Sequence, residues 1–201
     1  MSLILILSSS SFFLPAYLSK IIKTGSTPSD SQLLFAITQK NEHALLFALA
    51  REQEGSSRWL SLLTSLASKR GEAANRLGNW YAEQATSIVN NAELTTYNDK
   101  QAMKWYQQAL RLNYQHANIS IAQLYYKQSQ LNDAKKMLEK VSKLVASLGK
   151  DTSEQHSDLI IAFLVTKIQI AIDEGEVDLV HSLIQRKKHY LLQTAQGKGL
   201  L

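Results

Sequence analysis

Apolar side chains recur along most of this chain with the spacing of one helix face. Ala102, Trp105, Tyr106, Ala109 and Leu110 lie at positions i, i+3, i+4, i+7 and i+8, which places them on one side of an α-helix. Alternating β-branched and aromatic residues bounded by Asn-Gly or Asp-Gly turns are missing. The pattern therefore predicts an all-α protein.

Turn and capping residues divide the apolar stretches into separate helices. The expected helices cover Ser31–Lys40, Glu42–Gln53, Ser57–Lys69, about 72–89, a stretch that carries Ala102 to Leu110, about 116–128, a stretch that carries Ala134 to Val141, about 154–172, and 177–193. Ser29 or Asp30 is expected to cap the first of these helices and Asn132 the seventh. Asn90 to Asp99 is polar and is predicted to be a turn-like connection.

Two helix pairs in the middle of the chain resemble each other. In the first helix of each pair the matching positions are 44 apart: Leu77 with Ile121, Gly78 with Ala122, and Tyr81 with Tyr125. In the second helix they are 32 apart, Ala102 with Ala134 and Ala109 with Val141. The difference indicates a loop insertion around residues 88–98, because repeats tolerate insertions in loops but not between packed helices.

These motifs resemble a known family. Residues 74–81 followed by 102–109 resemble a Sel1-like repeat, and residues 117–141 resemble a tetratricopeptide repeat. The resemblance implies a right-handed α-solenoid of antiparallel helix pairs, in which Gly78 and Ala122 let paired helices approach closely and the aromatic residues at 81 and 125 fill the groove between them. The chain departs from the family in the missing Pro at each repeat end, in residues 86–100, and at Lys167, where a small residue is expected.

The rhythm of the pattern predicts three segments. Residues 1–29 form an apolar N-terminal segment and linker, residues 30–195 a helical-repeat domain with its clearest repeats at 73–145, and residues 196–201 a frayed tail. The apolar stretch from Leu3 to Leu14 lacks a preceding basic region, and Lys20 and Lys23 make it short for a membrane span. A packed helix, an export signal and membrane association through residues 1–22 all stay open.

Composition argues against most catalytic chemistry. The chain of 201 residues has no Cys, which excludes thiolate catalysis and Cys-ligated metals. The five His residues show no paired metal-binding spacing, and no nucleophile motif or phosphate-binding loop is found. The net charge of +5 is scattered along the chain, so no specific nucleic-acid binding is expected. We therefore expect no enzyme activity, no metal and no cofactor.

The candidate binding surface follows from the resemblance. The first helices of successive pairs would line a concave face that carries Asn75, Asn79, Glu83, Ile119, Gln123, Tyr126 and Lys127. Amide and ammonium groups hydrogen-bond an extended peptide or a carboxylate, although the same side chains are also ordinary solvent-facing helix residues.

Two functions remain open at this stage. The first is a non-enzymatic protein–protein interaction module or scaffold that binds a protein or peptide partner. The alternative is a membrane-anchored structural component of a bacterial envelope polysaccharide or secretion assembly. The apolar N-terminal segment favours the bacterial envelope or periplasm over the cytoplasm.

Overall fold

The structure, a computed structural model, describes residues 30–87, 91–148 and 154–197. These residues form helices and no strands, so the expected all-α class is confirmed for them. The helices are α2 (Asp30–Thr38), α3 (Glu42–Leu49), α4 (Ser57–Ala67), α5 (Gly71–Ser87), α6 (Ala92–Arg111), α7 (His116–Lys127), α8 (Leu131–Leu148), α9 (Glu154–Asp173) and α10 (Val177–Gly197). The N-terminal segment 1–29 lies outside the described residues.

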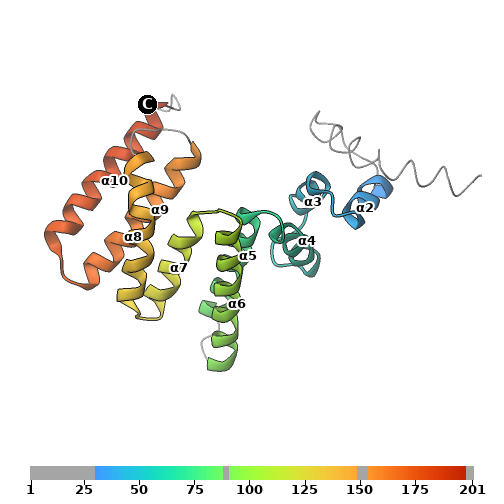
Figure 1. The fold of residues 1–201 in the computed structure, drawn as a ribbon, viewed down its shortest axis with the longest axis horizontal. Helices are drawn as coiled ribbons and strands as arrows, with labels where there is room; N and C mark the ends of the chain where they lie inside the picture. Colours follow the sequence, from blue (N-terminus) through green and yellow to red (C-terminus); the bar gives the residue numbers. More distant parts are fainter. Residues whose placement is uncertain (1–29, 88–90, 149–153, 198–201) are drawn as a thin grey trace, which may run out of the picture.

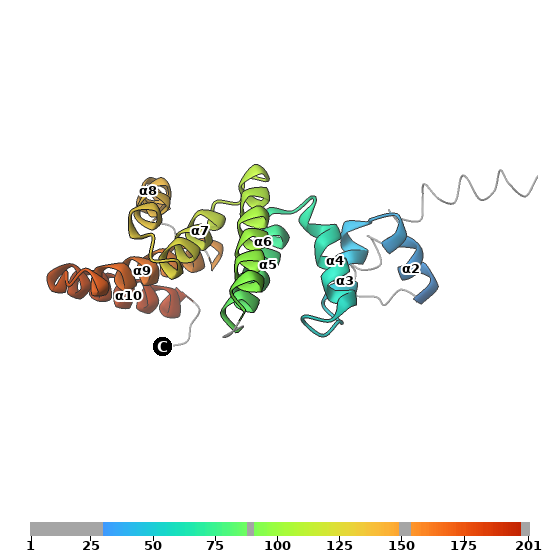
Figure 2. The ribbon, with the colours of Figure 1, turned by 90° about the horizontal axis from the view of Figure 1, so that it is seen from below.

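The helices follow one another across an elongated molecule. Each described helix packs against the next one in the chain, and α4 also meets α6, α5 meets α7, and α7 meets α9. Within the described ranges no helix contacts one that is more than two places away in the chain. Figures 1 and 2 show α2 to α4 at one end, α5 and α6 in the middle, and α8 to α10 at the other end. Packing is thus local along the chain.

Two large hydrophobic cores meet at α7. The first core runs from α3 to α7 and takes Ala117, Ile121 and Leu124 from that helix. The second runs from α7 to α10 and takes Ile119 and Ala122. Because its neighbouring positions belong to different cores, α7 is buried on several sides and joins the two halves of the array.

A common turn closes four of the helices. Lys40, Asn113, Ser129 and Gly175 each adopt a positive φ just beyond a helix end. In each turn two backbone hydrogen bonds reach back into the helix; at Ser129, for example, its own N–H and that of Gln130 donate to the carbonyls of Tyr126 and Tyr125. This is the Schellman arrangement, which satisfies the last carbonyls of a helix and reverses the chain in few residues. Successive helices are thereby brought side by side.

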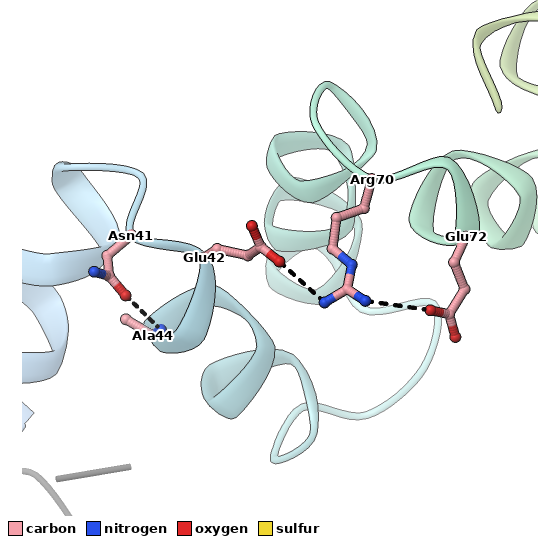
Figure 3. Close-up of polar contacts among 5 residues, drawn as sticks. All are labelled: Asn41, Glu42, Ala44, Arg70 and Glu72. Carbon is pink, nitrogen blue, oxygen red and sulfur yellow. Dashed lines mark hydrogen bonds and ion pairs between the residues drawn. The ribbon is translucent and has the colours of Figure 1, made fainter. Parts of the chain in front are cut away.

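Arg70, in the connection between α4 and α5, pairs with acidic residues of α3 and α5. Asn41 caps α3 by accepting a hydrogen bond from Ala44 N at 3.1 Å, and the next residue, Glu42, receives Arg70 Nη1 at 3.0 Å (Figure 3). The other guanidinium nitrogen lies 3.6 Å from Glu72 in the first turn of α5. The groups are partly exposed, so the pairs fix geometry more than they add stability.

Several expected boundaries are wrong. The polar stretch Asn90–Asp99 is mostly helical, because Asn91 caps α6 by accepting from Leu94 N at 3.0 Å and α6 begins at Ala92. Asn132 lies inside α8 rather than at its cap. Asp30 is the first residue of α2, and Ser29, the other expected cap, lies outside the described residues. The helix α10 continues through Gly197, and residues 198–201 lie outside the described ranges.

Candidate functional site

A groove of about 340 Å³ opens where α5, α6, α7 and α9 face a common space. Five of the expected binding residues line it: Asn79, Glu83, Gln123, Tyr126 and Lys127. They come from α5 and α7, the first helices of the two similar helix pairs, whose matching positions are 44 apart in the chain. The fold therefore brings residues of both helices to one groove.

Two expected surface residues lie elsewhere. Asn75 is buried in α5, and its Oδ1 has no hydrogen-bond partner among the described residues. Ile119 is buried in the second core, where the helices after α7 cover it. Assigning these two to an open binding face was therefore wrong. The neighbouring helices α4 and α7 pack on α5, and α9 packs on α7, so one side of each groove helix is closed.

The close approach of α5 and α6 shapes one wall of the groove. A Cβ atom added at Gly78 would lie 2.5 Å from the Tyr106 ring, so only glycine allows the ring to pack there, as expected from the sequence. This packing carries the Tyr106 hydroxyl to Asn79 Oδ1, to which it donates at 2.9 Å. Burial, and then the nearby carboxylates of Glu83 and Asp99, raise the pKa of Tyr106, so it remains a neutral donor.

Polar contacts from α7 tie the groove helices together. Gln123 Nε2 donates to the buried Thr166 Oγ1 on α9 at 3.1 Å. Lys127 Nζ donates to the Ala82 carbonyl on α5 at 3.1 Å and also to Thr86 Oγ1. Lys127 therefore holds α5 against α7 with the ammonium group that was expected to bind a partner.

Tyr126 marks the end of the groove near α9. Its phenol donates a hydrogen bond to Asp173, and that bond is the main reason that the pKa of Tyr126 lies above its ordinary value, with desolvation and the carboxylate charge adding to it. The aromatic ring is half-buried, so one part of it remains available to a bound group.

Side-chain amides from three alternate helices face this groove. Asn79 comes from α5, Gln123 from α7 and Gln169 from α9. Sequence reasoning missed Gln169 and Tyr106. Gln169 lies 46 positions after Gln123, which is close to the 44 positions between Asn79 and Gln123. Extending the same spacing to the last helix pair would therefore have indicated Gln169. Tyr106 had been assigned only to the core of its own helix.

Asn79 and Gln123 each keep one polar group that makes no hydrogen bond with another described residue. Asn79 uses Oδ1 for Tyr106, which leaves its amide nitrogen as a donor. Gln123 uses its amide nitrogen for Thr166, which leaves its carbonyl oxygen as an acceptor. The groove therefore offers a donor on α5 and an acceptor on α7, and a peptide backbone carries both an acceptor and a donor.

A second hollow, of about 350 Å³, lies between α8, α9 and the start of α10. Its floor is apolar and includes Leu138, Phe163 and Ile170, and its rim carries Lys135 paired with Glu174. It shares no residue with the first groove and was not expected from the sequence.

Other kinds of site were also considered. In residues 30–87, 91–148 and 154–197, no group of three or more His, Asp or Glu side chains is placed to hold a metal ion. Among the helices of these same ranges, none combines the length and apolarity that a membrane crossing needs. Comparison of the chain with protein-family models, curated proteins and solved structures finds no match.

Proposed function

We propose that this protein is a non-enzymatic interaction module that holds an extended segment of a partner protein in the groove between α5, α7 and α9. One observation carries the proposal: Asn79, Gln123 and Gln169, from three alternate helices, line a single open groove. In this proposal the helices form a right-handed solenoid like those of Sel1-like and tetratricopeptide repeats, and the groove lies on its concave face.

The chemistry of the groove suits a peptide backbone. The amide nitrogen of Asn79 can donate to a peptide carbonyl, and the carbonyl of Gln123 can accept from a peptide N–H. The half-buried Tyr126 offers apolar surface for a side chain of the ligand. Glu83 adds a negative charge at one edge, which favours a segment with a basic residue there.

Peptide selection from a random display library provides the test. Peptides enriched on the whole protein would be synthesised, and their affinities measured by calorimetry for the parent, for an Asn79→Ala/Gln123→Ala variant and for a control, Gln107→Ala/Gln185→Ala. The control removes exposed amides that do not line the groove.

We expect the groove variant to bind about tenfold more weakly, because each neutral hydrogen bond contributes about 0.5–1.5 kcal/mol. The control variant should bind like the parent. Equal affinity in the parent and the groove variant, or failure to enrich any peptide, would count against this function.

A further inference from the structure

One flank of α10 carries a row of exposed apolar side chains. Val177 is 75% exposed, Ile184 46% and Leu191 44%, and the half-buried Val180 lies between the first two. At 3.6 residues per turn these four fall within roughly one sixth of the helix circumference. The row is separate from Leu183 and Tyr190, which pack into the second core.

The row lies to one side of the helix face that packs on the array. Leu179 lines the hollow against α8, and it lies on the other side of the Leu183–Tyr190 face from the row. Figure 1 shows α10 at the outer edge of the array, beyond α9.

Charge along α10 is divided between its two halves. Acidic residues gather at the start, with Glu176 and Asp178, and basic residues follow in the second half, with Arg186, Lys187 and Lys188. None of these five forms an ion pair with a described residue. At 3.6 residues per turn Glu176, Lys187 and Lys188 flank the row, whereas Asp178 and Arg186 lie farther round the helix. The surface beside the row is therefore complementary to itself when one helix is reversed, and repulsive when two copies run parallel.

We propose that two copies of this chain form a symmetric dimer in which their α10 helices pair antiparallel through the row. Ile184 lies midway between Val177 and Leu191, so it sits near the two-fold axis, and Val177 of one copy meets Leu191 of the other. Antiparallel pairing also opposes the helix dipoles favourably. Gln169 points toward the groove from α9, so that groove remains open in the dimer, and the pairing does not depend on the proposed function.

Sedimentation over a wide range of concentration tests the dimer. The parent should change from monomer to dimer, whereas Ile184→Glu, which places two charges at the axis, should raise the dissociation constant more than about tenfold. Leu34→Glu is the matched control, since Leu34 is 56% exposed on α2 at the opposite end of the array. Circular dichroism verifies that both variants remain folded. A parent that stays monomeric throughout would overturn the proposal.

Charge reversal tests whether the opposite charges in the two halves of α10 stabilise the dimer. Lys187→Glu/Lys188→Glu should weaken the dimer, and adding Glu176→Lys to the same chain should restore part of it, because opposite halves meet in the antiparallel pair. Absence of rescue, with the triple variant folded, would contradict the pairing.

Cross-linking tests the orientation, and the absence of Cys from the natural chain makes each introduced thiol unique. With a short bis-maleimide, Ile184→Cys should cross-link to itself. Val177→Cys and Leu191→Cys should cross-link when mixed but not separately, since about 21 Å of helix separates like positions. Self-cross-linking of Val177→Cys, or no cross-linking in the mixture, would overturn the antiparallel arrangement.

Discussion

At the residue scale, Gly78 has the tightest steric constraint in the groove wall. A Cβ atom there would lie 2.5 and 2.6 Å from two Tyr106 ring carbons and 3.2 Å from the Ala102 carbonyl oxygen. The ring is buried and held by its hydrogen bond to Asn79, so it cannot move without disturbing the wall.

We therefore expect Gly78→Ala to lower the free energy of unfolding by about 1–3 kcal/mol, despite the better helix propensity of alanine. Urea unfolding followed by circular dichroism measures the change. The control is Gln107→Ala, an exposed substitution on α6 that should alter stability little. A Gly78→Ala protein as stable as the parent would show that the two helices are farther apart than described.

Tyr106 makes the stability depend on pH in the alkaline range. Burial raises its pKa above the ordinary value of about 10, so above that pH the unfolded chain loses the proton while the folded chain keeps it. The unfolded state then binds fewer protons, and stability falls as pH rises from about 10. Tyr81, Tyr114 and Tyr126, whose pKa values are also raised, add to the same slope.

Tyr106→Phe should reduce this alkaline loss of stability, and near neutral pH it should cost about 0.5–1.5 kcal/mol for the hydrogen bond to Asn79. Thermal unfolding of both proteins, recorded from pH 7 to 11, gives both quantities. Tyr97→Phe serves as control, because Tyr97 is exposed. Parallel pH profiles for the parent and Tyr106→Phe would mean that Tyr106 titrates normally.

At the element scale, the reversing turns place one residue each in the left-handed region. Ser129 has φ 58° between α7 and α8 and is exposed, whereas Gly175 has φ 71° in the matching turn between α9 and α10. A side chain with a Cβ is strained in that conformation, and glycine is not.

Ser129→Gly should therefore stabilise the protein by about 0.5–1 kcal/mol, and the reciprocal Gly175→Ser should destabilise it by about 1 kcal/mol. Chemical denaturation of the two single variants provides the comparison. Opposite signs are the essential result, and a destabilising Ser129→Gly would contradict the turn geometry.

The elements also show how far the sequence alone can lead. Helix spacing predicted the core positions of α6 because it depends on local pattern, and the resemblance to known repeats implied the close helix contact at Gly78. The first turns of α6 were misread as a loop because they are largely solvent-exposed and polar, so they carry little apolar periodicity. The cap at Asn91 was the signal that could have corrected this.

The site was predictable only to the level of a helix face. Asn75 and Asn79 lie one turn apart on α5, and only the crossing of neighbouring helices decides that the first is buried and the second lines the groove. Thr166, to which Gln123 donates a hydrogen bond, lies 43 positions away on α9. Such contacts between distant residues depend on tertiary packing, and the local pattern of a single sequence does not reveal them.

At the scale of the whole molecule, stability should be distributed along the array. Described helices contact only their first and second neighbours, and the two main cores meet only through α7 and the residues packed on it. In such a quasi-one-dimensional protein, a local change alters the stability of its own neighbourhood most.

Two leucine substitutions test this distribution. Leu63 on α4 belongs to the first core and Leu164 on α9 to the second, and each side chain is 0% exposed. Replacing either by Ala should cost about 2–5 kcal/mol locally. Hydrogen exchange followed by mass spectrometry should show faster exchange in α3–α5 for Leu63→Ala and in α8–α10 for Leu164→Ala. Because each variant is the control for the other, uniform acceleration along the chain in both would show that the helices unfold as one unit, and α7 would not be a junction between separable cores.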